Sequence, residues 1–363
     1  MAVNSEGREM TRLEVQQSRV VCGPDENKHG GSFDASTTFA TASLEEQARA
    51  RALEQPLSIE VTRVSPSELE CELHSAPAPI VNALRRILLA EVPTMAIEKV
   101  FIRNNTSPVN DESLAHRLGL VPILADARRF HEASSGSSFT ESNCIAFRLH
   151  AYHSRDSDDA ELLSDGSARA VCVYSKQLEH LPRGSDWPPE EEEAASKLTQ
   201  FSSSQSDVFS PVNNDILLAK LGPGQEIDLH AIAMKGRGSE HAKWSPVGTA
   251  WYRLVPEVKL LRRLSHDEAS ELVRRAGRRC GCYRAVAGGI EEVVQRPRGC
   301  TFCREMVRTM SGESGWDNAI QLRKLKHSFI FTIESTGCIP AAELFKQAVH
   351  LLRQKCQDNK SSL

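Results

Sequence analysis

The chain has 363 residues, of which 40% are apolar and 25% charged, the composition of an ordinary soluble globular protein with a sizeable core and roughly two domains. A formal net charge of −4 argues against a surface that binds nucleic acid by charge alone, and no apolar run approaches the length of a membrane span. Ten cysteines without a secretory signal favour reduced thiols or a metal site over disulfides, hence a reducing compartment.

The first 55 residues lack sustained periodicity, and the small, polar run at positions 30–43 is typical of an unfolded segment. Residues 1–55 are therefore predicted to be a disordered or loosely attached tail. Apolar and polar residues then alternate over positions 57–62 and 69–73, around the turn Ser65-Pro66-Ser67. This pattern predicts a hairpin of two half-buried strands.

A helix is predicted from Ile80 to Val92, because Pro79 fits a first helical turn and Pro93 ends the helix. One stripe with a period of 3.6 residues holds Ile80, Ala83, Leu84, Ile87 and Leu88. Val81 and Leu89 lie outside this stripe, so apolar residues reach most of the way round the helix. We therefore expect it to be covered by the chain's own sheet and by a second helix, from this protein or from another.

Further elements follow from similar patterns. A strand is predicted at 96–103, then a helix with Asp111 as N-cap and Gly119 as its end. Capping and dipole effects explain Asp111 and Glu112 better than paired catalytic acids do, and His116 is expected to be structural.

The segment 130–246 is predicted to be a β-rich insertion. Strands are expected at 144–152 and 170–174, and a hairpin at 216–221 and 226–233, whereas the acidic and serine-rich tract at 183–207 is expected to be solvated.

The last part of the chain is predicted to contain a strand at 250–254, a helix at 267–276 and a strand through Phe329, Phe331 and Ile333. Pro340 then opens a final helix, whose apolar positions recur at helical spacing at Leu344, Ala348, Leu351 and Leu352.

Four cysteines, Cys280, Cys282, Cys300 and Cys303, have a spacing that could close a tetrahedral zinc site, although the first pair is one residue too short. Incidental cysteines are the favoured interpretation, so we expect no metal and no cofactor. A zinc-dependent nucleic-acid-binding module, using nearby arginine pairs, is the alternative. No nucleotide-binding or nucleophile motif is present, so no catalytic residue is assigned.

Several runs in fixed order carry a resemblance. They are N-A-L-R-R-I-L-L-A-E-V-P-T-M-A-I-E-K-V at 82–100, D-E-S-L-A-H-R-L-G-L-V-P-I at 111–123, L-G-P-G-Q-E-I-D-L at 221–229, H-A-K-W-S-P-V at 241–247 and H-S-F-I-F-T-I-E-S-T-G-C-I-P at 327–340. Together they resemble the alpha-like subunits of cellular RNA polymerases, the family of bacterial alpha and archaeal D. The closest variant is the larger alpha-like subunit shared by eukaryotic RNA polymerases I and III.

The resemblance implies an α+β fold in which an alpha-like dimerisation domain, at 56–129 and 247–356, is interrupted by an inserted, mostly antiparallel β domain at 130–246. A polar tail would occupy 357–363. The RNA polymerase II subunit is the alternative within the family. It has a zinc-binding cysteine cluster in the insertion, where this chain offers only Cys144 and Cys172.

The implied function is a non-catalytic scaffold in the nucleus, including the nucleolus. It would pair with the smaller alpha-like subunit and, with small assembly subunits, nucleate assembly of the large catalytic subunits that transcribe rRNA, 5S rRNA and tRNA. Direct sequence-specific DNA binding and membrane attachment are not expected. The predicted partner-binding residues are Ile80, Asn82, Leu84, Arg85, Arg86, Leu88, Leu89, Leu344, Ala348 and Leu351.

The two arginines have a more specific expected role. Arg85 and Arg86 flank an otherwise apolar helix, and in the family this pair lies towards the large catalytic subunits. Two surface arginines with apolar stems packed along the helix are the simpler alternative.

Overall fold

A computed structural model of the chain describes residues 12–23, 26–30, 56–132, 139, 142–154, 161–162, 169–181, 209–262, 264–276, 283–286, 289–292, 308–310, 316 and 319–361. The chain divides into two compact units. Unit 1 comprises Met1–Thr62, Glu70–Asn82 and Trp251–Thr332, and unit 2 comprises Arg63–Leu69, Ala83–Ala250 and Ile333–Leu363. Within the described ranges, no helix is long and apolar enough to cross a membrane.

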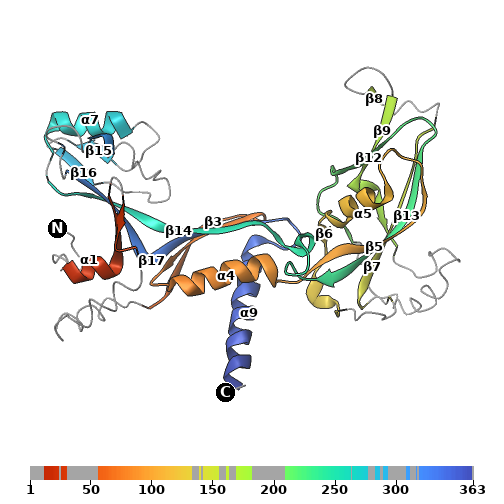
Figure 1. Ribbon diagram of the computed structural model, residues 1–363, viewed down its shortest axis with the longest axis horizontal. Helices are drawn as coiled ribbons and strands as arrows, with labels where there is room; N and C mark the ends of the chain where they lie inside the picture. Colours follow the sequence, from red (N-terminus) through yellow and green to blue (C-terminus); the bar gives the residue numbers. More distant parts are fainter. Residues whose placement is uncertain are drawn as a thin grey trace. The chain divides into compact units, whose positions relative to one another are not determined.

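Unit 1 is built on a six-stranded sheet with the order β2-β1-β17-β4-β3, and β14 also pairs with β17 (Figure 1). Its strands are β1 (Arg19–Cys22), β2 (Asn27–Lys28), β3 (Ser58–Val64), β4 (Glu68–His74), β14 (Val247–Leu260) and β17 (Ile320–Ser335). The unit also holds α1 (Arg12–Ser18), α7 (His266–Ala276), and the two-stranded pair β15 (Tyr283–Val286) and β16 (Gly289–Glu292).

The N-terminal segment contributes a strand to this sheet. β1 pairs antiparallel with β17, from Arg19 opposite Leu325 to Cys22 opposite Leu322. Val20 and Cys22 are buried in the core of unit 1. The loosely attached tail predicted for residues 1–55 is therefore wrong for α1 and β1. The segment is too short to show a period, and a long-range backbone ladder holds it in place.

The predicted hairpin forms, but only its second strand is covered. Leu69, Cys71 and Leu73 of β4 are buried as expected, whereas Ile59 and Val61 of β3 are exposed. Alternation fixes which side chains share a face, but it does not show whether anything covers that face. The half-buried strand predicted at 57–62 is thus an exposed one.

Unit 2 contains a four-stranded antiparallel sheet in the order β10-β7-β13-β5, and the smaller sheets β11-β6 and β12-β9-β8. Its strands are β5 (Thr94–Asn105), β6 (Ile123–Leu124), β7 (Cys144–Tyr152), β8 (Glu161–Leu162), β9 (Arg169–Tyr174), β10 (Leu178–His180), β11 (Ser210–Pro211), β12 (Leu217–Leu221) and β13 (Glu226–Gly236). The helix α5 (Asp111–Gly119) and the short 3-10 helices η1 (Ala127–Arg129), η2 (Ser175–Gln177) and η5 (Ala242–Trp244) complete this part. Its core includes Leu114, Phe147 and Leu229.

The α+β fold class is confirmed, and three local predictions change. β12 pairs with β9 and β13 pairs with β5 and β7, so the hairpin predicted at 216–233 does not form. Because β5 pairs along its whole length with β13, it shares a sheet with the segment predicted to be an insertion. The N-cap of α5 is Asn110, and Asp111 is its first residue.

The helix α4 (Ala78–Ala90) begins in unit 1 and ends in unit 2, where its last turn is held by backbone contacts. The amide N–H of Ser239 donates to the carbonyl of Ala90 at 2.9 Å. A Cβ atom on Gly238 would collide with the carbonyl oxygen of Leu89, so only glycine allows this approach. The loop after β13 therefore fixes the end of α4.

Residues of the H-A-K-W-S-P-V run at 241–247 hold the same loop against the neighbouring strands. Trp244 donates its Nε1–H to the carbonyl of Met234 at 3.1 Å and accepts at its own carbonyl from Thr94 Oγ1 at 2.7 Å. Lys243 Nζ donates to the carbonyl of Ile97 at 3.0 Å and lies 4.5 Å from the Trp244 ring centroid. These contacts attach β5, which directly follows α4, to the loop that holds α4.

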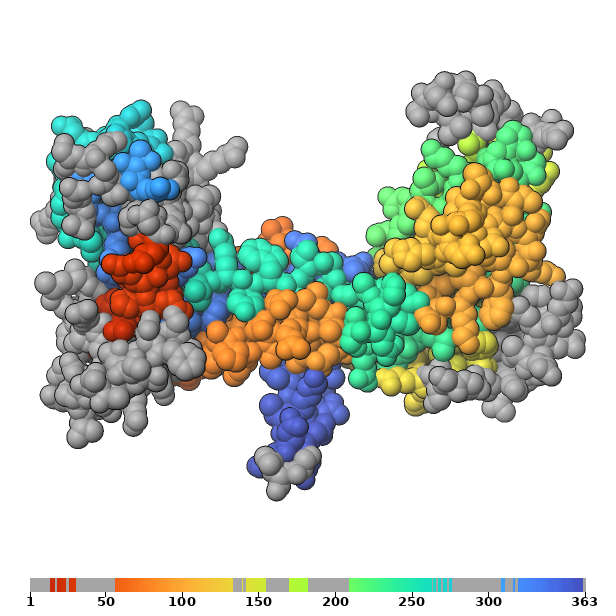
Figure 2. All heavy atoms as spheres, viewed as in Figure 1, coloured from red at the N-terminus to blue at the C-terminus, as the bar shows by residue number. Residues whose placement is uncertain are grey.

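The last helix, α9 (Ala341–Ser361), starts from backbone bonds inside unit 2. The N–H of Ala341 donates to the carbonyl of Pro66, and the N–H of Ser335 donates to that of Ser67. Further along, Lys355 Nζ lies 2.5 Å from a carboxylate oxygen of Glu91. The spheres of the C-terminal half of α9, in blue, extend past those of α4, in orange (Figure 2).

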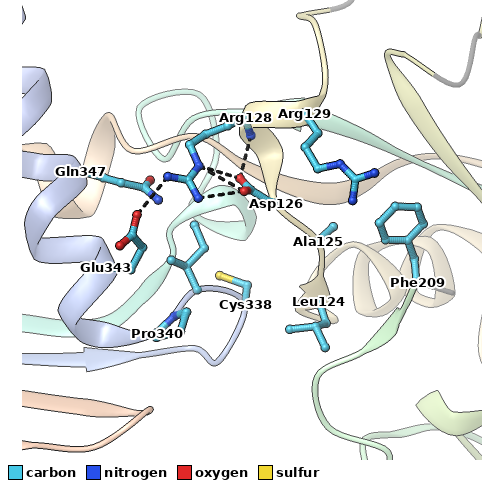
Figure 3. Close-up of a pocket in the computed structure, with 11 residues that line it drawn as sticks. Leu124, Ala125, Asp126, Arg128, Arg129, Phe209, Cys338, Pro340, Glu343 and Gln347 are labelled. Atoms are coloured by element: carbon cyan, nitrogen blue, oxygen red, sulfur yellow. Dashed lines mark hydrogen bonds and ion pairs between the residues drawn. The ribbon is translucent and has the colours of Figure 1, made fainter. Parts of the chain in front are cut away.

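Arg128, at the centre of η1, ties the first turn of α9 to the rest of unit 2 (Figure 3). Its guanidinium holds Asp126 with two bonds of 2.9 and 2.8 Å and Glu343 with a third of 2.9 Å. Hydrogen bonding to Arg128 lowers the pKa of Asp126 below its ordinary value of 3.8. We call this group of three residues the Arg128 clamp.

Replacing Gly238 with alanine should destabilise the chain by roughly 1–3 kcal/mol, because the new methyl group must push the Leu89 carbonyl away. Gly248→Ala is the matched control, since the nearest atom to a Cβ there, the carbonyl oxygen of Glu334, is 3.9 Å away. The midpoint of thermal unfolding of the full chain measures both effects. Equal midpoints for the two variants would show that the chain accommodates a Cβ atom beside the Leu89 carbonyl without loss of stability.

Removing the Arg128 clamp should lower the free energy of unfolding by a small amount that depends on pH. Arg128→Ala should cost about 1 kcal/mol or less near pH 7, because Arg128 is 57% exposed. The folded-state pKa of Asp126 is lowered, so its stabilisation is present above its ordinary pKa and is lost as the pH falls through the folded value.

Urea unfolding at several pH values tests this prediction. The difference in the free energy of unfolding between wild type and Arg128→Ala should become smaller towards strong acid. The free energy of unfolding of Arg128→Lys should lie between those two values, because lysine keeps the charge but lacks the planar guanidinium group. A difference that grows towards acid would contradict the assignment.

Candidate partner-binding surface

The buried side of α4 follows most of the predicted stripe, since Leu84, Ile87 and Leu88 are buried. Val81 and Leu88 are completely buried, and Leu84 and Ile87 nearly so. Ile80, which the sequence assigned to the stripe, is 41% exposed. Val81 is buried in the first turn instead of Ile80, because apolar residues surround most of the helix and their spacing alone does not decide between these two positions.

α9 carries two apolar stripes side by side. Its inner stripe of Ala341, Leu344 and Ala348 is completely buried. An outer stripe at i, i+4 and i+7 comprises Phe345, Val349 and Leu352; Val349 is 42% exposed and the other two are half-buried. From Arg353 to Ser361 every residue is exposed. The outer stripe is thus available for contact with another protein.

Four predicted partner-binding residues, Leu84, Leu88, Leu344 and Ala348, belong to the interior of the chain itself. Their burial leaves them almost no surface for a partner. The other six keep accessible area: Ile80, Asn82, Arg85, Arg86, Leu89 and Leu351. Phe345 and Val349 were not predicted, although their spacing of four residues, continued by Leu352, indicates a second apolar face of the helix.

On α4, the accessible residues follow one line along the helix. Asn82, Arg86 and Leu89 occur at i, i+4 and i+7, with Arg85 beside them. Arg86 is exposed, and within the described part of the chain it makes no ion pair. A half-buried leucine next to two guanidinium groups offers a partner both apolar area and donors for carboxylates or carbonyls.

Beside the Arg128 clamp lies a pocket of about 340 Å³ in unit 2 (Figure 3). Its lining residues include Leu124, Phe209, Cys338 and Pro340. Two basic and two acidic side chains also line it, so charge favours neither an anionic nor a cationic small ligand. Burial raises the pKa of the Cys338 thiol, which makes it a poor nucleophile.

One group of three potential metal ligands, Glu60, Glu72 and His74, occurs in the described ranges, with ligand atoms within 4.8 Å of one another. His74 Nε2 lies 3.3 Å from Glu72 and its Nδ1 lies 3.4 Å from the hydroxyl of Ser328. Both ring nitrogens therefore have protein partners, so the geometry does not require an ion. The four cysteines considered as zinc ligands, and the acidic tract at 183–207, lie outside the described residues.

Comparison with known proteins identifies the family. Residues 70–356 match the RNA polymerase Rpb3/Rpb11 dimerisation domain. The chain is 38% identical to the DNA-directed RNA polymerases I and III subunit RPAC1 of Homo sapiens over 319 residues, 84% of each chain.

Two relatives from Dictyostelium discoideum extend the comparison. Identity to its DNA-directed RNA polymerases I and III subunit rpac1 is 34% over 298 residues, which cover 82% of this chain and 79% of the relative. Identity to its DNA-directed RNA polymerase II subunit rpb3 is 29% over 311 residues, which cover 83% of this chain and 92% of the relative. The chain belongs to the family of RNA polymerase subunits with the Rpb3/Rpb11 dimerisation domain, the non-catalytic, alpha-like assembly subunits.

Proposed function

We propose that this chain is the larger alpha-like subunit shared by RNA polymerases I and III and that it forms a heterodimer with the smaller alpha-like subunit. The observation that carries the proposal is the outer stripe of α9, together with Leu89 of α4. These apolar side chains are accessible in the free chain, within a region that matches a dimerisation domain. Accessible apolar stripes on helices are typical of protein interfaces.

The choice of polymerases I and III over polymerase II is supported by a comparison within one organism. The chain is 34% identical to the polymerase I and III subunit of Dictyostelium discoideum, but 29% identical to its polymerase II counterpart. The human relative with 38% identity is likewise named as a subunit of polymerases I and III.

In this role the heterodimer would nucleate assembly of the two large catalytic subunits, with small assembly subunits, for transcription of rRNA, 5S rRNA and tRNA. A subunit of these polymerases acts in the nucleus, and the polymerase I form would place it in the nucleolus. Arg85 and Arg86 would form charge-assisted contacts with a large subunit, since guanidinium groups bind carboxylates with two parallel hydrogen bonds.

Co-expression with the smaller alpha-like subunit, followed by sizing chromatography, tests the pairing. The free chain should self-associate or precipitate, and the co-expressed chains should elute as a soluble 1:1 complex. A stable, soluble monomer that does not bind the smaller subunit would contradict the proposal.

Single charges should locate the contact. Leu89→Asp and Val349→Asp should each abolish the pair, because a carboxylate buried without a partner costs on the order of several kcal/mol. Gln354→Asp is the matched control, as it adds the same charge at an exposed position of α9 away from the outer stripe. Leu88→Asp is unsuitable because Leu88 is buried within the chain.

Circular dichroism of each variant establishes that the fold is retained. If folded Val349→Asp and Leu89→Asp pair as well as Gln354→Asp does, the smaller subunit does not bind this surface.

Arg86→Ala should separate pairing from later assembly. The heterodimer should form normally, because Arg86 is exposed and lies beside the apolar contact, whereas recovery of the large catalytic subunits on a tagged heterodimer should fall. Arg353→Ala, which removes an exposed arginine of α9, is the control. Undiminished recovery with Arg86→Ala would favour the simpler interpretation of a solvated arginine.

A further inference from the structure

The outer stripe of α9 has the spacing of an apolar seam between two helices. Cys356, which is exposed, continues the stripe, so its members follow one another at steps of four, three and four residues. In a two-helix coiled coil, the residues that contact the partner helix recur at these alternating steps. The outer stripe therefore fits one partner helix that runs along α9.

Three basic residues lie along one side of this stripe. Lys346, Arg353 and Lys360 are seven residues apart, and all three are exposed. Each residue of an α-helix is rotated by about 100° from the one before it, so every seventh residue returns to nearly the same side. We call these three residues the basic line of α9.

The outer stripe lies between the basic line and the inner stripe. In the first turns of α9, Leu344 of the inner stripe comes directly before Phe345 of the outer stripe, and Lys346 comes directly after it. Lys355, the remaining lysine of α9, lies on the inner side, where it pairs with Glu91 at the end of α4. A helix packed on the outer stripe would thus have this chain on one flank and the basic line on the other.

The chain itself offers the basic line little negative charge. Lys346 Nζ lies 4.0 Å from a carboxylate oxygen of Glu343, which already binds Arg128 at 2.9 Å, and the Lys346 side chain is 76% exposed. Within the described part of the chain, neither Arg353 nor Lys360 makes an ion pair. Positive charges in a row beside an apolar stripe favour a partner with negative charges at the matching positions.

We propose that the outer stripe of α9 binds a helix of the smaller alpha-like subunit, and that this helix carries acidic residues at about every seventh position, which pair with the basic line. The inference deepens the proposed function and rests on it. Residues 70–356, which match a dimerisation domain, include the outer stripe. Charged residues that flank an apolar seam determine which helix pairs and in which register.

The basic line also acts against a wrong partner. A second copy of α9 packed antiparallel on the same stripe would bring two basic lines together, and juxtaposed like charges disfavour association. The line thereby favours pairing with the smaller subunit over pairing of two identical chains.

Charge reversal tests the proposal. Wild-type and variant chains with different tags are co-expressed with a limiting amount of the smaller subunit, and the share of each chain in the heterodimer is measured. The double variant Lys346→Glu, Arg353→Glu should be recovered about tenfold less than wild type or worse, because two attractive contacts become repulsive. The double variant Lys346→Arg, Arg353→Lys keeps both charges and should compete as well as wild type.

Lys28→Glu combined with Lys220→Glu is the matched control. It makes the same change of net charge at two exposed lysines outside α4 and α9, so it should compete as well as wild type. Circular dichroism establishes that each variant keeps its helix content.

Salt separates charge from packing. The dissociation constants of the wild-type and charge-reversed heterodimers, measured by dilution, should differ about tenfold or more at about 0.1 M salt. At about 1 M salt they should differ by less than about threefold, because the screening length falls from about 10 Å to about 3 Å.

Two results would overturn the proposal and leave the proposed function intact. In the first, the charge-reversed chain competes as well as wild type or better, so the flank of the partner helix is not acidic. In the second, its deficit is the same at both salt concentrations, so the loss comes from packing. Failure of the wild-type chain to pair with the smaller subunit at all would instead refute the proposed function.

Discussion

The close approach of Gly238 to the Leu89 carbonyl is the constraint on which the accessible surface at the end of α4 depends. A helix with apolar residues on nearly every side has no preferred orientation from hydrophobicity alone. Backbone contacts at its last turn select one orientation, because the Ala90 carbonyl must meet the Ser239 N–H. Once that orientation is fixed, Val81, Leu84 and Leu88 are inside and Leu89 remains at the surface.

Sequence patterns predicted the existence of most elements and the fold class, because long periodic segments such as α9 and β17 specify their own secondary structure. The burial of Val81 instead of Ile80 on α4 was not predictable, since both residues are apolar and their spacing does not decide between them. The pairing of β1 with β17 and of β5 with β13 was missed because it joins segments that are far apart in the chain. Leu89 was among the predicted partner-binding residues, whereas Val349 was not, because it lies beside the buried stripe of Leu344 and Ala348 on α9.

Polar contacts in this protein orient the helices and add little stability of their own. The Arg128 clamp and the pair between Lys355 and Glu91 are both partly exposed, so each contributes modestly. Their value is geometric. They hold α9 at its first turn and again at Lys355, while its inner stripe supplies the burial that stabilises the helix. The outer stripe is thereby presented in a defined direction.

The accessible surface on α9 and the end of α4 offers side chains rather than backbone groups, because the backbone of a helix is already hydrogen-bonded within it. On α9 and the end of α4, recognition of a partner would rely on side-chain burial, so its specificity would lie in shape and would be sensitive to a single charge. The helical surface is therefore a candidate for choosing the partner, since a partner of the wrong shape would leave Leu89 and the outer stripe uncovered.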